Sequence, residues 1–231
     1  MKGRIWLIPV TLGDDNFRAV IPAEVLEITR KLRYFIVEDL RSARRYLRMI
    51  DRQFPIDDSV FLELNEHNSR NDPADYLKPL LDGNDAGLMS EAGMPGIADP
   101  GASVIAAAHR QNIRVTPLAG PSSIIMALIS SGMNGQNFTF NGYLPVKPAE
   151  RAAKLKELER KALEGISQIF METPYRNQAM LESIMATCKK DTYLCIAADI
   201  TLPGELISTK KISEWKMEAP CLKNRNVIFV L

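Results

Sequence analysis

Short apolar runs alternate with segments of helical apolar spacing along the first half of the chain. The runs predict strands at residues 4–10, 34–37, 86–89 and 113–116. The helical spacing predicts helices at 22–33, 40–52 and 103–111, and Asp72-Pro73 has the composition of a helix start. Such alternation is typical of a mostly parallel sheet with helices on its faces.

The second half repeats this alternation. It predicts a helix at 123–131 that Gly132 stops, further helices at 149–163 and 175–188, and strands at 138–141, 168–172, 193–198 and 226–230. The turn-rich segment 118–123 lies between the halves and predicts a boundary there. We therefore expect an α/β fold with an N-terminal domain (1–118) and a C-terminal domain (119–231), each a mixed or mostly parallel sheet flanked by helices.

Composition narrows the class of protein without defining a function. The chain has 231 residues, 46% of them hydrophobic, and its 29 Lys and Arg against 28 Asp and Glu leave a net charge of +1. Three cysteines without a CxxC pair and two distant histidines indicate neither a disulfide frame nor a metal site. The apolar start breaks at Pro9, too early for a signal segment, and no run has transmembrane length, so we expect a soluble cytoplasmic protein.

The segment 87–101 is the strongest candidate for a ligand loop. Gly93, Gly96 and Gly101, with Pro95 and Pro100, follow the predicted strand 86–89 and exclude a regular helix or strand there. In open α/β sheets, ligands bind at the carboxyl ends of strands. The alternative is an ordinary tight connection.

Two further segments carry a functional and a structural interpretation. Gly120-Pro121-Ser122-Ser123 opens a helix, whose free N–H groups could hold an anion, although taken alone the segment is better explained as a capped helix start. His67, in the polar stretch 64–68, could act as a base near neutral pH, whereas such stretches are usually surface loops.

Acidic and basic groups lie together after the second predicted strand. Glu38 and Asp39 are placed to stabilise a helix N-terminus or to take part in chemistry. At helical spacing there follow Arg41, Arg44, Arg45, Arg48 and Arg52. This arginine stripe is either a solvated face or a surface for phosphate or RNA.

Two loops in the second half share a pattern. Segments 142–148 and 172–176 each place Lys or Arg and an aromatic side chain at the end of a predicted strand. Their repetition favours a wall of a substrate site.

Several of these segments together resemble the tetrapyrrole methylase superfamily. Within it, the chain is most similar to the branch that methylates the 2′-oxygen of a cytidine in small-subunit ribosomal RNA. The matching segments, in the family's order, are 38–41, 90–96 followed by Asp99-Pro100-Gly101, 120–122, 138–145 and 172–176. The chain departs from the family pattern at Leu40, Ala43, Glu91, Met94 and 198–202, and it lacks the C-terminal extension.

The resemblance implies S-adenosylmethionine as cofactor, bound in a cleft between the two domains, and a homodimer. The cofactor-binding residues that it implies are Pro9, Leu12, Gly13, Ser90, Glu91, Ala92, Gly93, Pro95, Asp99, Gly120, Pro121, Ser122, Tyr143, Met171 and Ala198.

A ribose hydroxyl needs a proton acceptor, for which the candidates are Glu38, Asp39 and His67. The candidates for contacts with RNA phosphates are Arg41, Arg45, Lys147, Arg151 and Arg176. Two other functions remain open: methylation of a tetrapyrrole or another small molecule, and S-adenosylmethionine binding without catalysis.

Overall fold

The computed structural model describes residues 1–13, 16–64 and 72–231. They form two compact units, Met1–Ser122 and Ser123–Leu231, each with its own sheet. His67 and the neighbouring residues of its polar stretch lie outside the described residues.

The first unit contains a parallel sheet of order β3-β2-β4-β1-β5. Its strands are β1 (Arg4–Leu7), β2 (Tyr34–Val37), β3 (Val60–Glu63), β4 (Ala86–Met89) and β5 (Arg114–Pro117). All four residues of the central strand β4 are buried, as expected for a parallel strand that helices cover on both faces.

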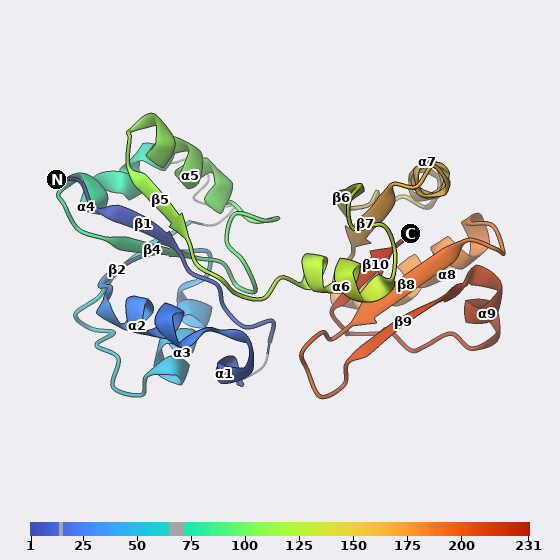
Figure 1. The fold of residues 1–231 in the computed structure, drawn as a ribbon, viewed down its shortest axis with the longest axis horizontal. Helices are drawn as coiled ribbons and strands as arrows, with labels where there is room; N and C mark the ends of the chain where they lie inside the picture. Colours follow the sequence, from blue (N-terminus) through green and yellow to red (C-terminus); the bar gives the residue numbers. More distant parts are fainter. Residues whose placement is uncertain (14–15, 65–71) are drawn as a thin grey trace. The chain divides into compact units, whose positions relative to one another are not determined.

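Helices cover this sheet in two layers (Figure 1). One layer holds α1 (Phe17–Val20), α2 (Ala23–Lys31) and α3 (Leu40–Ile50). The other holds the 3₁₀ helix η1 (Pro73–Leu77), α4 (Lys78–Leu81) and α5 (Gly101–Arg110).

Helix α3 separates its apolar and charged faces clearly. Ala43, Tyr46, Leu47 and Ile50 are buried against the sheet at helical spacing. The carboxylate of Asp39 caps the helix, because its Oδ1 accepts a hydrogen bond from the Ser42 amide at 2.6 Å. Because the apolar stripe packs against the sheet, the opposite face of α3, which carries the arginines, remains in solvent.

The second unit contains a mixed sheet of order β6-β7-β10-β8-β9. Its strands are β6 (Phe138–Tyr143), β7 (Ser167–Met171), β8 (Tyr193–Ala198), β9 (Leu206–Lys211) and β10 (Val227–Val230). Only the β6–β7 pair is parallel; the other three pairs are antiparallel.

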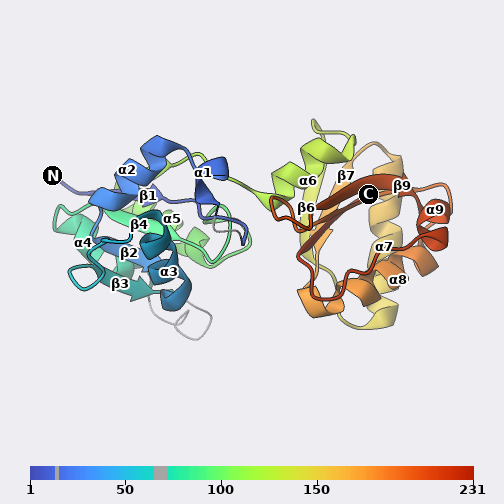
Figure 2. The ribbon, with the colours of Figure 1, turned by 90° about the horizontal axis from the view of Figure 1, so that it is seen from below.

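One helix covers one face of this sheet, and several cover the other (Figure 2). Helix α6 (Ser123–Ser131) contacts β8, β9 and β10. The main core of the unit lies on the opposite face, beneath α7 (Pro148–Leu163), α8 (Asn177–Thr187) and α9 (Ile212–Met217), with the 3₁₀ helix η2 (Pro174–Arg176) leading into α8.

The structure confirms the α/β class and corrects four details. The sequence did not predict the edge strands β3 and β9 or the short helices α1 and α9. Because β9 pairs antiparallel with β8, the second sheet does not repeat the parallel pattern of the first. Strand β1 ends at Leu7 instead of residue 10; Pro9 has no N–H for a ladder, and Val10 forms an isolated bridge with Gly93.

Candidate functional site

The candidate site of the first unit lies at the carboxyl edge of its parallel sheet. Since β4 lies between β2 and β1, the loops that follow these three strands are neighbours. The Val10 amide donates to the Gly93 carbonyl at 2.9 Å, and the Glu91 amide donates to Glu38 Oε2 at 3.0 Å. The glycine-rich loop after β4 is thus tied to the loops on both sides.

Asp99 fixes the course of that glycine-rich loop. Its Oδ2 accepts from the Gly96 amide and its Oδ1 from the Gly101 amide, both at 2.7 Å. Gly93 and Gly96 have φ values of 71° and 86°, in the region that favours glycine. Asp99, which the resemblance assigns to cofactor binding, therefore also shapes the loop.

The loop after β5 packs closely against the loops after β1 and β4. A Cβ atom on Gly120 would overlap the ring of Pro9, and one on Gly93 would lie 3.4 Å from the Pro121 carbonyl oxygen and 3.2 Å from Leu12 Cδ2. The structure therefore brings together six of the predicted cofactor-binding residues, which are Pro9, Leu12, Glu91, Gly93, Gly120 and Pro121.

The remaining predicted residues of this unit lie within the same loops. Ser90 donates its hydroxyl to the Ala92 carbonyl at 3.2 Å, and Pro95 is buried. Gly13, Glu91 and Ala92 are exposed, whereas Ser122 is partly buried. Exposed residues beside a glycine turn leave room for the close approach of a ligand.

Glu38 and Asp39 have opposite electrostatic environments. Burial raises the pKa of Glu38; the hydrogen bond from the Glu91 amide opposes this, and the charges of Glu91, Asp99 and Asp39 add to it. The pKa of Asp39 is lowered, mainly by its hydrogen bond from the Ser42 amide. Glu38 is therefore the better proton acceptor, and Asp39 is held as an ionised helix cap.

Tyr46 is a member of this site that the sequence did not indicate. Its hydroxyl, on the buried face of α3, donates to the Pro9 carbonyl at 3.2 Å, and burial raises the pKa of the phenol. In the sequence Tyr46 is one more apolar position of the helix, so only the fold shows that it supports the loop after β1.

The arginines of α3, and Arg52 just after the helix, lie on its solvent-facing side. All five side chains from Arg41 to Arg52 are exposed. Arg44 lies over the Phe61 ring at 5.3 Å, and Arg48 donates to the Arg52 carbonyl at 2.9 Å. Of the predicted RNA contacts, Arg41 lies in the first turn of the helix, close to Glu38 in the chain, and Arg45 lies at its middle.

In the second unit, several predicted residues gather at one edge of the sheet. Tyr143 pairs in register with Met171, and Glu172 follows Met171. Arg176 Nη2 binds Glu172 Oε1 at 2.6 Å, and its guanidinium lies 5.4 Å from the Tyr175 ring centre. The hydrogen bond that Arg176 donates to Glu172 raises the pKa of Arg176.

The other predicted residues of this unit differ in exposure. Lys147 is exposed and pairs with Glu150 at 3.0 Å. Arg151 is buried and donates to the Val146 carbonyl at 3.4 Å, an arrangement that supports the start of α7. Ala198 is fully buried at the end of β8.

Glu172 and the Asp199–Arg225 pair are polar groups that the predicted residue set omits. Glu172 is buried and pairs with the partly exposed Arg176, and Arg225 Nε binds Asp199 Oδ2 at 2.6 Å. Glu172 belongs to one of the matching segments, so its motif was a usable signal. Asp199 and Arg225 are 26 positions apart, so no short sequence motif indicates that they pair.

Within the described ranges, no cluster of three or more His, Cys, Asp or Glu side chains could hold a metal ion. Nor does any described helix combine the length and hydrophobicity needed to cross a bilayer.

The fold and these loops define an α/β protein with a glycine-rich loop at the carboxyl edge of its first sheet, and comparison with known proteins defines its family. Residues 18–216 match the family model described as Tetrapyrrole (Corrin/Porphyrin) Methylases. The chain belongs to the tetrapyrrole methylase family.

Among curated relatives, the ribosomal RNA small subunit methyltransferase I of Escherichia coli O157:H7 is 30% identical, over 92% of this chain and 71% of that protein. The protein of the same name from Haemophilus influenzae is 33% identical over 95% of this chain and 75% of that protein. The crystal structure of the methyltransferase CobJ has the same fold, with a TM-score of 0.63 at 16% identity over 99% of this chain and 93% of that one.

The close approach of Gly120 to Pro9 gives a test of the loop packing. We expect Gly120→Ala to lower the free energy of unfolding by about 1–3 kcal/mol, because the added methyl group overlaps the proline ring. Urea unfolding measures the change. Gly135→Ala is the control, since its Cβ would meet nothing within 4 Å. An unfolding midpoint for Gly120→Ala equal to that of Gly135→Ala would contradict the packing described.

Proposed function

We propose that this protein is an S-adenosylmethionine-dependent methyltransferase that modifies the ribose 2′-oxygen of a cytidine in small-subunit ribosomal RNA. The observation that carries the proposal is the similarity, at 30–33% identity over more than nine-tenths of the chain, to proteins named ribosomal RNA small subunit methyltransferase I. Action on ribosomal RNA implies a cytoplasmic protein.

The loops at the carboxyl edge of the first sheet fit the proposed cofactor. Its adenine and amino-acid ends need donors and acceptors at close range, and the glycine-rich loop places the exposed residues Glu91 and Ala92 beside the turn at Gly93. S-adenosylmethionine supplies an electrophilic methyl group. Pro9, Leu12, Gly13, Ser90, Pro95, Asp99, Gly120, Pro121 and Ser122 complete the proposed contacts in this unit, and Tyr143, Met171 and Ala198 are those proposed in the other.

Glu38 is the residue best suited to take the proton of the ribose hydroxyl. The Glu91 amide orients its carboxylate, and partial burial raises its affinity for a proton. The same tie to Glu91 holds Glu38 beside the proposed cofactor loop, so that the hydroxyl would be aligned and deprotonated at one place. His67 stays a candidate base from sequence alone.

Arginine side chains supply the proposed contacts with RNA. Arg41 and Arg45 extend from an exposed helix face. A planar guanidinium group can donate two parallel hydrogen bonds to the oxygens of one phosphate. In the second unit, Lys147 and Arg176 keep exposed surface, whereas the buried Arg151 is better explained by its bond to Val146.

Glu38→Gln tests the assignment of the base, with Asp39→Asn as the matched variant that keeps a helix-capping oxygen. We expect Glu38→Gln to lower kcat by about 10²-fold or more and Asp39→Asn by only a few-fold. Because the carboxyl must be ionised to act, kcat of the wild type should fall as pH drops through a pKa above the ordinary 4.5, and Glu38→Gln should lack that limb.

A pH–rate profile of single-turnover methyl transfer makes this measurement. A large loss in Asp39→Asn with normal Glu38→Gln would transfer the role to Asp39. Unchanged kcat in both variants would leave neither carboxylate as the base.

Arg41→Ala tests the contact with phosphate. We expect weaker RNA binding and a decrease of about 0.7 in the slope of log affinity against log salt, the value for one single-strand phosphate. Fluorescence anisotropy of labelled RNA from 50 to 200 mM salt measures the slope. Arg110→Ala, which removes an exposed arginine from α5, is the control. An unchanged slope in Arg41→Ala would remove Arg41 from the RNA surface.

The function itself is tested by transfer of labelled methyl groups. The protein is incubated with methyl-labelled S-adenosylmethionine and small ribosomal subunits from cells that lack this modification. Label on a cytidine 2′-oxygen supports the proposal. Label on an added corrin or porphyrin, but not on RNA, would instead support the small-molecule function that the family description names. Cofactor binding without any transfer would indicate a binding protein that lacks catalysis.

A homodimer is also proposed, on the resemblance and on one exposed helix face. Helix α6 exposes Ile125 and Ile129, one turn apart, and Ile129 retains 74% of its accessible surface. Apolar side chains at this spacing form a contact stripe. We expect dimers in sedimentation equilibrium and a shift toward monomer in Ile129→Glu, with the exposed Leu163→Glu as control. A monomeric wild type would refute the dimer.

A further inference from the structure

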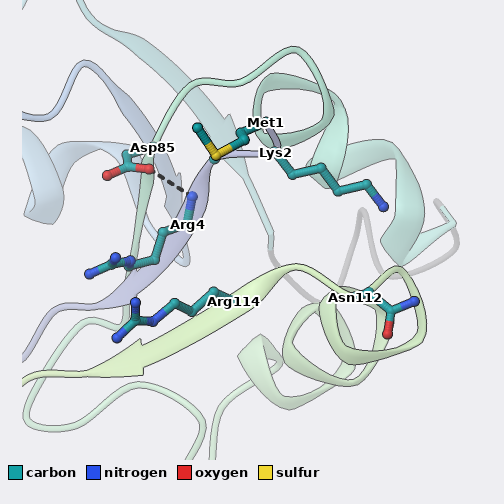
Figure 3. Close-up of a pocket in the computed structure, with 7 residues that line it drawn as sticks. Met1, Lys2, Arg4, Asp85, Asn112 and Arg114 are labelled. Carbon is teal, nitrogen blue, oxygen red and sulfur yellow. Dashed lines mark hydrogen bonds between the residues drawn. The ribbon is translucent and has the colours of Figure 1, made fainter.

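A second concave surface lies at the opposite edge of the first sheet, where the strands begin. A pocket of about 480 Å³ opens there beside the amino ends of β1 and β5 (Figure 3). Its polar walls are Lys2, Arg4, Asp85, Asn112 and Arg114. None of these residues belongs to the loops at the carboxyl edge.

Two arginines stand side by side in this pocket. Arg4 and Arg114 occupy paired positions of the adjacent parallel strands β1 and β5, and both side chains extend in the same direction (Figure 3). Arg4 is oriented by the Trp6 ring, whose centre lies 4.6 Å from its guanidinium carbon. Within the part of the chain that the structure describes, neither guanidinium forms an ion pair with a carboxylate.

The carboxylate in the pocket is engaged elsewhere. Asp85 Oδ1 accepts from the Arg4 amide at 2.7 Å, and Oδ2 accepts from Trp6 Nε1 at 3.1 Å. Lys2 Nζ donates to the Gln111 carbonyl at 2.6 Å. Two arginines therefore stand near one carboxylate, whose oxygens already accept from the main chain and the indole, while Lys2 extends away from them (Figure 3).

The backbone at Gly3, next to Arg4, packs closely against the segment that precedes β4. The Gly3 amide donates to the Leu80 carbonyl at 2.7 Å, and a Cβ on Gly3 would overlap the Asn84 carbonyl. Like charges on directly paired strand positions repel each other. Two guanidinium groups in this position would be stabilised by an anion that bridges them.

We propose that Arg4 and Arg114 form a binding site for a phosphate group. Phosphate oxygens accept paired hydrogen bonds from guanidinium groups, and one tetrahedral anion can bridge two of them. The group belongs either to an RNA backbone, a source that rests on the proposed function, or to a free phosphorylated small molecule. The site itself does not depend on the proposed function.

Nuclear magnetic resonance of the arginine side chains in the full chain tests the site. Inorganic phosphate is titrated at constant ionic strength against chloride, with the Nε–H signals labelled with ¹⁵N. We expect phosphate to shift two signals, assigned by their absence from Arg4→Lys and Arg114→Lys. Arg114 is exposed, so Arg114→Gln should leave the fold intact and weaken phosphate binding at least fivefold. Arg110→Gln, which changes an exposed arginine outside the pocket, should not weaken it. Equal shifts by chloride, or equal weakening in Arg110→Gln, would overturn the site.

A second arm identifies the source of the phosphate. If it is RNA, Arg114→Gln should lower the salt slope of RNA affinity by about 0.7. An unchanged slope, with phosphate binding intact in the first arm, overturns the RNA source and supports a small phosphorylated ligand. Because the first arm uses neither RNA nor methyl transfer, failure of the site is distinguishable from failure of the proposed function.

Discussion

The close packing of the central strand β4 is the constraint on which the first unit depends. A Cβ on Gly87 would overlap Ile8 Cδ1 and would lie 3.2 Å from both Leu32 Cδ1 and Phe35 Cδ1, so the core on that face of the strand can pack this closely only against a glycine. With β4 in this place, its loop must emerge between the loops of β1 and β2. The bonds from Val10 to Gly93 and from Glu91 to Glu38 then follow from position in the sheet.

The same arrangement separates two neighbouring carboxylates into different roles. Asp39 stands at the first turn of α3, where an amide stabilises its charge. Glu38, one residue earlier, points to the loop after β4 and lies near the carboxylates of Glu91 and Asp99. A shift of one residue along the strand end is therefore enough to make one acid a helix cap and the other a proton acceptor.

Much of the fold could be predicted from sequence where burial imposes a clear pattern. The segments 34–37, 86–89, 123–131 and 193–198 have the predicted bounds because they are apolar and end at turn residues. Strand β9 was missed because it lies at a sheet edge and all its residues are half-buried, which leaves little apolar signal. Strand β3, also at an edge, has a short apolar run at residues 60–62, which sequence reasoning overlooked.

The same reasoning limits what the sequence says of the site. The glycine-rich loop was predictable because its closely spaced glycines and prolines exclude a regular helix or strand after residue 89. The support that Tyr46 gives to Pro9 was not, because it joins residues 37 positions apart through the fold. The predicted roles of the cofactor- and RNA-binding residues are proposals, since geometry alone places side chains together without identifying their ligand.

The edges of the second sheet have a consequence for how copies of the chain can meet. On β9, Lys210 and Lys211 lie over the rings of Trp215 and Tyr193, so charge lines the outer strand. On β6, the pairing shifts between Phe140 and Tyr143, around Gly142 with its φ of 63°. Charged side chains and irregular pairing both hinder the addition of a foreign strand. The sheet is thereby protected from edge-to-edge aggregation, and helical faces remain as the surfaces through which the unit can associate.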